Sequence, residues 1–168
     1  MQYLKRSAAE RAQLMDSLAA MTAYLRQQFA GLSARQACLP GPDGAFSPVE
    51  QVWHLCDLER EGFGVRIRRL RDETMPHLPD FDGARIAQQR NYRALSLSAG
   101  LEAFAAARAA TLVALQALPA AAWMRDGIQE GVGTVSLCDM PAFLLQHDQA
   151  HRLGIEQWQR LRRPSADG

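Results

Sequence analysis

Two histidines, His147 and His151, lie four residues apart in the segment LLQHDQAHRLGIEQW near the end of the chain. In a helix, side chains at this spacing lie on the same face, one turn apart. Both belong to a heptad-like run of positions that should face the interior, namely Met140, Leu144, His147, His151, Gly154 and Trp158. Two neutral imidazoles buried together each need a donor and an acceptor partner, so the pair is costly without a shared ligand. The pattern predicts either two nitrogens offered to one cation or two core histidines that form hydrogen bonds.

A third histidine, His54, lies in the segment VWHLCDLERE, far from the other two in sequence. Leu58 and Val65 follow it on the same face of a predicted helix, so His54 could also point into the interior. Metal sites in helix bundles are built from inward side chains on facing helices, often with an i, i+3 or i, i+4 pair on one of them. Three imidazoles suit zinc, nickel or another borderline divalent ion, and they leave coordination positions open for water or substrate. The residues therefore predict a metal site at His54, His147 and His151, with core histidines as the alternative.

Two acidic residues follow His54 on the same predicted helix, Asp57 after one turn and Glu61 after two. Either carboxylate could orient a metal ligand through a hydrogen bond or move protons near a bound water, which makes both candidate catalytic residues. The alternative for both is a solvated helix face, and for Asp57 this alternative is favoured.

The segment HDQAH differs from the H-E-x-x-H motif of zinc proteases only in Asp148, which stands where those enzymes have glutamate. The shorter carboxylate would place a general base differently, and no further ligand follows in the sequence. A protease is therefore not expected. The fourth histidine, His77, lies in a linker between prolines and is expected to be exposed to solvent.

Four long amphipathic helices must position these side chains. Apolar residues recur at spacings of three and four, which predicts helices over residues 7–31, 47–75, 98–118 and 136–162. A short helix is expected over residues 84–94. Gly62 and Gly64 each cost the second helix about 1 kcal/mol relative to alanine, so either a close neighbour or a local bend should explain them. The pattern is typical of an all-α protein, and we expect a four-helix bundle that forms a single domain over residues 1–168.

Helix starts and long connections are also marked in the sequence. The segment SPVE (residues 47–50) can form a capping box, Ser98 can cap the third helix, and Ser136 with Asp139 resembles a second capping box. The connections between the second and third helices and between the third and fourth are long, and each could cover a site. The Gly-rich segment RDGIQEGVGTVS in the later connection predicts a loop or a small hairpin.

Composition excludes several classes of protein and partner. The 168 residues carry a formal net charge of +1, so no long-range field attracts nucleic acid or anionic lipid. The basic segment RIRRLR (residues 66–71) has acidic neighbours and is expected to be a solvated helix face. The charged N-terminus lacks the apolar core of a signal peptide, and no uninterrupted apolar run is long enough to span a bilayer. The three cysteines form no CxxC pair, so we expect a cytoplasmic protein without a disulfide framework.

With His54 in the second helix and HDQAH in the last, the chain resembles the DinB/YfiT-like superfamily. Other segments match the family pattern in order and spacing: FSPVEQVWHLCDLEREGF in the second helix, LPDFD and NYR after it, FAAARAATLVALQAL in the third helix, and W-x-R-x-G with VSL before the last. The resemblance covers about residues 46–160. It implies a four-helix bundle in which His54, His147 and His151 are the metal ligands.

Characterised members of this superfamily include thiol-dependent S-transferases that use bacillithiol or mycothiol, a maleylpyruvate isomerase and metal-dependent hydrolases. Their shared chemistry is a metal that lowers the pKa of a bound thiol or water and so produces a nucleophile near neutral pH. The resemblance implies an enzyme that uses a divalent ion, zinc or nickel, and in the transferase case a low-molecular-weight thiol, on a small electrophilic substrate. The alternative is a non-catalytic metal-binding or dimeric assembly protein, and a homodimer is expected.

The chain departs from the family pattern near the expected site. Many relatives have glutamine three residues after the last ligand, where this chain has Gly154, and His-Pro in the loop where it has Ile128 and Gln129. These differences concern contacts with a substrate more than metal binding. The sequence does not name the electrophile, the thiol or the metal.

Overall fold

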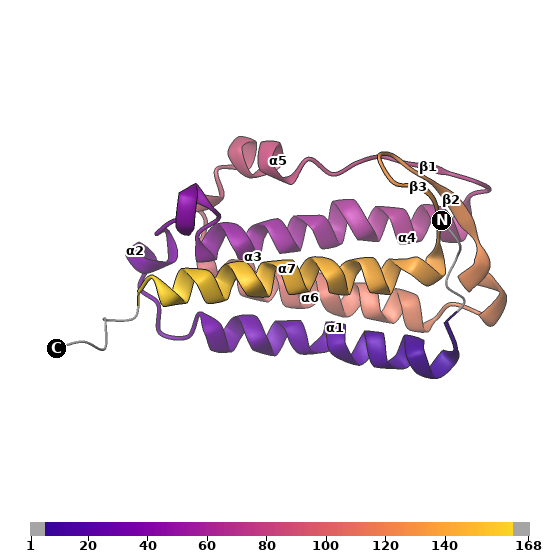
Figure 1. The fold of residues 1–168 in the computed structure, drawn as a ribbon, viewed down its shortest axis with the longest axis horizontal. Coiled ribbons are helices and arrows are strands. Elements are labelled where there is room, and N and C mark those ends of the chain that lie inside the picture. The colour runs from indigo at the N-terminus through magenta and orange to yellow at the C-terminus, as the bar shows by residue number, and fades with distance from the viewer. Residues whose placement is uncertain (1–5, 163–168) are drawn as a thin grey trace.

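The computed structural model describes residues 6–162 and confirms the predicted fold class. Four long helical segments lie side by side in a bundle (Figure 1). They are α1 (Ala8–Gln28), the continuous run of α3 (Pro48–Asp57), η2 (Leu58–Phe63) and α4 (Gly64–Asp72), α6 (Leu97–Gln116) and α7 (Met140–Arg160). Helix α6 packs against α3 and α1, and α1 packs against α7.

Serine residues cap the N-termini of the second and third of these long segments. Ser47 and Glu50 form the predicted capping box at the start of α3. Helix α6 is capped by Ser96, which has extended backbone angles and accepts a hydrogen bond from the amide of Ala99. The expectation that Ser98 caps this helix was wrong. Its hydroxyl lies in the first turn, 2.9 Å from that of Ser96, because the chain turns helical two residues earlier than the apolar pattern indicated.

The second long helix widens into a π-helix over η2, one turn after His54. A Cβ atom at Gly64 would lie 2.6 Å from the carbonyl oxygen of Glu59, and one at Gly62 would lie 2.5 Å from Cδ1 of Leu58. The two glycines therefore permit a local distortion of the helix itself, which is the second of the explanations that the sequence left open. Such π-turns inside α-helices are frequent at functional sites.

Short helices occupy the connections. They are α2 (Ala34–Ala37) and η1 (Pro42–Gly44) before α3, α5 (Gly83–Arg90) and η3 (Tyr92–Ala94) before α6, and η4 (Ala120–Met124) and η5 (Leu137–Asp139) before α7. The helix predicted over residues 84–94 is divided, because Asn91 has left-handed backbone angles (φ 47°, ψ 58°). The predicted capping box of Ser136 and Asp139 is present at the N-terminus of η5, which leads into α7.

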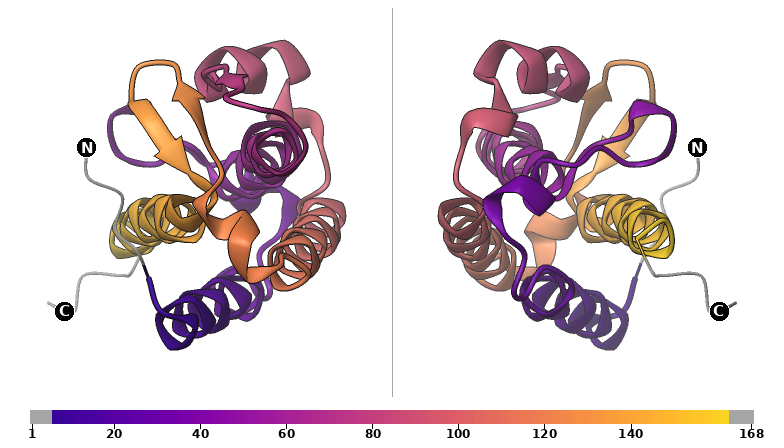
Figure 2. Two further views of the ribbon diagram at one scale, coloured as in Figure 1. Left: turned by 90° about the vertical axis from the view of Figure 1, so that its right-hand side faces the viewer. Right: turned by 90° about the vertical axis from the view of Figure 1, so that its left-hand side faces the viewer.

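A three-stranded sheet joins the two long connections. Strands β2 (Asp126–Gln129) and β3 (Gly133–Ser136) form the predicted hairpin, and β1 (His77–Leu78) lies parallel to β2. Strand β1 was not predicted, because two residues carry no strand pattern and their partner lies far along the chain. The sheet and α5 lie on the side of the bundle away from α1, next to the run of α3 and α4 and to α7 (Figures 1 and 2). Both long connections therefore cover the helices that carry the histidines.

Apolar side chains of all four long segments form the core. The predicted stripe of α1 is buried at Leu18 and Leu25, and that of α7 at Leu144 and Trp158. These contacts fix the rotation of α7, so the histidines that share its stripe must face the neighbouring helices.

Helix α6 has the length and the mean hydropathy, 1.3, of a membrane-spanning helix, and it is the one such helix among residues 6–162. This is weak evidence for a span, because core helices of bundles share the same composition. Phe104 and Leu115 of α6 lie in the core, and Arg108 pairs with buried carboxylates of two neighbouring segments. These contacts are those of a helix packed within a bundle.

Candidate metal centre

The three candidate histidines meet between α3, which carries His54, and α7, which carries His147 and His151. The Nε2 atom of His147 lies 3.4 Å from Nε2 of His54 and 3.2 Å from Nε2 of His151. One ligand atom from each ring lies within 4.8 Å of the other two, a spacing that could hold one metal ion. The i, i+4 spacing brings the two rings of α7 together, and the packing of the bundle supplies the third.

Both Nε2 separations that involve His147 fit a tetrahedral ion. Nitrogens about 2.0–2.1 Å from zinc, at tetrahedral angles, lie about 3.3 Å from one another, which is close to both Nε2 separations. A neutral imidazole carries one N–H and one lone pair, so three Nε2 atoms that face each other cannot all be satisfied by one another. The Nδ1 atoms of His54 and His147 are buried and have no hydrogen-bond partner within the described residues. A shared cation would satisfy all three Nε2 lone pairs at once.

Gln51 on α3 fixes the protonation of His151. Its Oε1 atom forms a short hydrogen bond with Nδ1 of His151. An amide oxygen only accepts, so Nδ1 carries the proton and the lone pair is left on Nε2, the atom that faces His147. The amide of Gln51 packs close to the backbone of Gly154, where a Cβ atom would lie 3.4 Å from Nε2 of Gln51, an ordinary van der Waals contact. Sequence reasoning missed Gln51, although a polar residue one turn before His54 on a buried helix face was the available signal.

Replacing Gln51 by leucine is expected to lower the affinity for a divalent ion by about 10–100-fold, because the ring of His151 loses the partner that orients it. Gln51→Glu keeps an oxygen acceptor and is the matched control, for which we expect most of the affinity to remain. Titration of the metal-free variants with zinc measures both constants. Equal affinity of Gln51→Leu and the wild type would exclude an orienting role.

Burial keeps the three rings uncharged. It lowers the pKa of His54 to about 4, with a further contribution from His147, and it lowers the pKa of His151 to about 2, with contributions from both other rings. Burial also lowers the pKa of His147 to about 4, helped by the positive charges of Arg108 and Arg66. Neutral imidazole is the form that binds a metal, so the site has its ligand form at neutral pH without first having to lose protons.

The start of α5 packs directly on the ring of His54. A Cβ atom at Gly83 would lie 2.3 Å from Cε1 and 2.7 Å from Nδ1 of that ring. We expect Gly83→Ala to displace the ring, to weaken metal binding and to lower the free energy of unfolding by about 1–3 kcal/mol, the usual cost of overpacking. Chemical denaturation and zinc titration measure the two effects. Ala84→Ser, at the exposed neighbouring position, should change neither quantity, and an unchanged Gly83→Ala variant would contradict the contact.

The family of the chain follows from how much of it matches one family model. Residues 9–155 match the family model of the DinB superfamily. The chain belongs to the DinB superfamily. This confirms the resemblance found in the sequence.

The DinB chain is similar to the solved structure of YfiT from Bacillus subtilis, described as "a probable metal-dependent hydrolase with an unusual four-helix bundle topology". The two share 17% sequence identity with a TM-score of 0.86, and the match covers 96% of this chain and 92% of that one. At this identity the likeness concerns the fold. No curated protein matches the chain.

The two acidic residues predicted near the site hold a connection of the DinB fold in place. Oδ2 of Asp57 accepts a hydrogen bond of 2.5 Å from the hydroxyl of Tyr92 and lies 2.6 Å from Nη1 of Arg90. Glu61 lies 2.8 Å from the same Nη1 atom. These contacts attach α5 and η3 to the second long helix, and the partners of both carboxylates are Arg90 and Tyr92 rather than the histidines. A role for Asp57 or Glu61 in proton transfer stays a prediction.

Asp148, between the two histidines of α7, belongs to a buried ion cluster of the DinB bundle. Its carboxylate accepts from both Nη atoms of Arg108, at 2.6 and 2.9 Å. Arg108 also pairs with Glu59 through Nε, and Glu59 accepts a hydrogen bond of 3.0 Å from Thr111. Asp148 is thus committed to a structural ion pair, so its carboxylate is not free to serve as the general base of a protease motif. Sequence reasoning missed this cluster, whose signal was a lone arginine in an alanine-rich helix.

A cavity of about 410 Å³ adjoins the histidines. Its wall includes His54 and His147 and the aromatic rings of Phe81 and Phe143. Four further polar side chains line it, those of Arg66, Asp80, Gln129 and Gln146. The residues come from the second long helix, the linker after β1, the end of β2 and α7. The two long connections therefore form one wall of a cavity whose other wall carries the candidate ligands.

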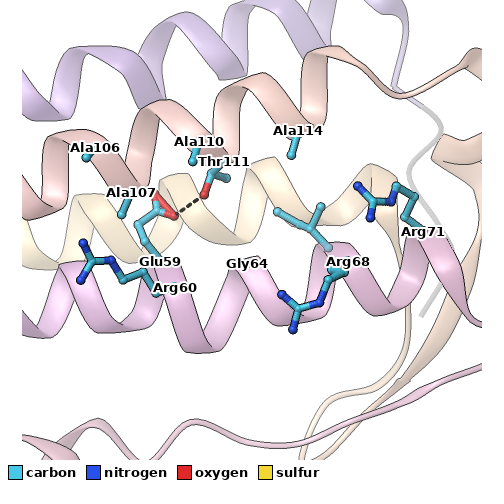
Figure 3. Close-up of a pocket in the computed structure, with 11 residues that line it drawn as sticks. Glu59, Arg60, Gly64, Arg68, Arg71, Ala106, Ala107, Ala110, Thr111 and Ala114 are labelled. Carbon is cyan, nitrogen blue, oxygen red and sulfur yellow. Dashed lines mark hydrogen bonds between the residues drawn. The ribbon is translucent and has the colours of Figure 1, made fainter.

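A second cavity of about 460 Å³ lies between α6 and the run of η2 and α4 (Figure 3). Its lining contains none of the histidines. Alanines of α6 form one side, and Arg60, Arg68 and Arg71 stand on the other. Its buried carboxylate, Glu59, already bonds to Thr111, as Figure 3 shows, and to Arg108. The candidate site is therefore the smaller cavity beside the histidines.

Proposed function

We propose that this DinB protein is a metal-dependent enzyme that hydrolyses a small electrophilic substrate. The observation that carries the proposal is the convergence of three neutral imidazoles beside an open cavity. Within the part of the chain that the structure describes, no cysteine or carboxylate joins the three as a fourth ligand, so coordination positions are left for water or substrate. The description of YfiT as a metal-dependent hydrolase agrees with this chemistry.

The residues at the site would have separate roles in this reaction. The three histidines would hold the ion through Nε2, and Gln51 would keep the ring of His151 oriented. Zinc and nickel are ions that imidazole ligands suit. When bound, such an ion lowers the pKa of a coordinated water or thiol and polarises a carbonyl group. Phe81 and Phe143 would exclude bulk water from the adjoining cavity.

Two other functions remain candidates. In a thiol S-transferase, a low-molecular-weight thiol would take the place of water, and the same cavity would hold part of it. In a non-catalytic metal-binding or dimeric assembly protein, the ion would only stabilise the bundle. The open coordination positions and the adjoining cavity favour an enzyme, because a structural site is usually closed by a fourth protein ligand.

We also propose a cytoplasmic homodimer with a small-molecule substrate and without nucleic acid or membrane partners. The absence of a nucleic-acid partner is supported by the segment at residues 66–71. Arg66 is buried, Arg69 pairs with Glu73, and Arg71 pairs with its neighbour Asp72. Within the described part of the chain, Arg68 is the one arginine of this segment that is exposed without an ion pair, so little unpaired positive charge is presented.

Metal removal tests the proposed enzyme. Protein expressed without a histidine tag is loaded with zinc or nickel and tested on a panel of small esters and amides. We expect hydrolysis that is lost after chelation, that returns when the ion is added back, and that needs no thiol. Activity that appears only with an added thiol would favour the transferase instead. Hydrolysis that survives complete chelation would contradict a metal-dependent reaction at this site.

A further inference from the structure

Two side chains that line the cavity beside the histidines each have one buried polar atom without a hydrogen-bond partner among the described residues. Arg66 is 6% exposed and Gln129 is 8% exposed, and both line the cavity. Nε of Arg66 and Oε1 of Gln129 have no hydrogen-bond partner among residues 6–162. Leaving a buried donor or acceptor unsatisfied is costly, and more so for a charged group. A donor and an acceptor on one cavity wall therefore point to a ligand that supplies the complementary groups.

The positive charge of Arg66 is only partly compensated by the protein. Its Nη2 atom donates a hydrogen bond of 3.2 Å to the carbonyl oxygen of Pro79. The carboxylate of Asp80 lies 3.9 Å from the same atom, but its side chain is 72% exposed to solvent. Burial lowers the pKa of Arg66, and Asp80 offsets part of this. Arg66 also contributes to the lowered pKa of His147, so its charge acts on the proposed metal site.

Most of the remaining wall of the cavity is apolar and aromatic. Leu58, Phe63, Phe81 and Phe143 line it, and the guanidinium of Arg66 lies 5.4 Å from the ring centroid of Phe63. A volume of about 410 Å³ is in the range of pockets for small molecules. The cavity thus combines the buried cation of Arg66 and the buried acceptor of Gln129 with an apolar surface beside the histidines, and the exposed side chains of Asp80 and Gln146 complete its lining.

We propose that Arg66 binds a carboxylate of the substrate and that Gln129 accepts a hydrogen bond from an adjacent N–H, so the substrate is an N-acyl amino acid. A guanidinium binds the planar carboxylate through parallel N–H donors, and the free Nε is one of them. In an N-acyl amino acid, the amide N–H and the carboxylate are attached to the same carbon, which suits a donor and an acceptor on one wall. An apolar amino-acid side chain would pack against Phe81 and Phe143.

This inference rests on the proposed hydrolase function and adds a substrate class to it. Hydrolysis of such a substrate adds water across the acyl C–N bond. The hydroxyl group goes to the acyl carbon, which becomes a carboxylic acid, and the nitrogen leaves with the proton as the free amino acid. Arg66 and Gln129 would hold the amino-acid half, so the acyl carbon would lie on the histidine side of the cavity.

Binding to the metal-free protein tests the carboxylate site without requiring activity. Calorimetry compares three probes: N-acetylphenylalanine, N-acetylphenylalaninamide, which lacks the carboxylate, and inorganic phosphate. We expect the acid to bind about ten- to a hundredfold more tightly than the amide, because the amide cannot form the charge-assisted hydrogen bonds. Equal binding of acid and amide, or no binding of the acid, would overturn the proposal. Phosphate that binds as tightly as the acid would overturn the assignment of a carboxylate.

Matched variants locate the effect. Arg66→Gln should remove the preference for the acid, whereas Arg68→Gln, which removes the same charge from an exposed position of α4, should keep it. Asp80→Asn should bind the acid a few-fold more tightly and the amide unchanged, because a competing carboxylate is removed; this exposed variant decides the matter if Arg66→Gln does not fold. An Arg66-dependent preference in a protein that shows no metal-dependent hydrolysis would support the carboxylate site and overturn the hydrolase.

Discussion

Replacing Arg108 by methionine is expected to lower the free energy of unfolding by about 3–5 kcal/mol, because it leaves buried carboxylates without a counter-charge. Glu59, Arg108 and Asp148 are each at most 2% exposed, and Nη1 of Arg108 also donates to the carbonyl oxygen of Leu18 at 2.9 Å. The guanidinium thus links α6 to α1, η2 and α7. Urea denaturation of the metal-free protein measures the loss.

A pH series and two further variants separate this effect from a loss of packing. Burial raises the pKa of both Glu59 and Asp148 in the folded protein, although Arg108 opposes this. Without Arg108, the pKa of both carboxyl groups in the folded state would rise further above their pKa in the unfolded state. The deficit of Arg108→Met should therefore shrink as the pH falls from neutral toward the carboxyl range. Constant destabilisation at every pH would indicate lost packing instead.

An exposed ion pair provides the matched control. Arg26 and Glu102 join α1 to α6 at 2.9 Å, with side chains 49% and 73% exposed. Arg26→Met should cost less than about 1 kcal/mol, because solvent screens such pairs. A variant in which all three buried charges are replaced by apolar residues should recover much of the stability that Arg108→Met loses. If it stayed as unstable as Arg108→Met, the missing counter-charge would not be the cause.

The helices could be predicted because their signals are local. The stripe of α1 and the capping box at Ser47 depend on residues within one or two turns of each other. Predictions failed where two local solutions compete, as at Ser96 and Ser98, which both can cap the third helix. Strand β1 depends on pairing with β2, and no local signal at His77 announces it.

The convergence of the three histidines could be predicted from the sequence, and the surroundings of the site could not. His147 and His151 share a helix face, the inward face of a second predicted helix added His54, and the family resemblance supported the same three residues. Gln51 and Gly83 contact the histidines through the packing of separate segments, which a single sequence does not encode in its spacing. Gln129 stood out as a departure from the family pattern, and the structure places it on the wall of the adjoining cavity.

Replacing His147 by alanine is expected to lower the affinity for zinc or nickel strongly. Loss of a residue that only supports a ligand lowers metal affinity by about 10–100-fold, and loss of a ligand itself should lower it further. The Nε2 atom of His147 is the one close to both other rings, at 3.4 and 3.2 Å, so its removal leaves two ligands on facing helices without the shared neighbour. Elemental analysis of protein purified without a histidine tag, followed by zinc titration of the metal-free form, measures the change.

The order of affinities across variants distinguishes a metal site from a pair of core histidines. His77→Ala removes an exposed histidine outside the cluster and should bind zinc as tightly as the wild type does. The zinc affinity of Gln51→Leu should be lower than that of the wild type and higher than that of His147→Ala. Loss of packing alone would lower the melting temperature of metal-free His147→Ala without producing this order. Equal metal content in His147→Ala and the wild type would make the three rings core histidines, because a cation held by Nε2 of all three cannot keep its affinity when the central ligand is gone.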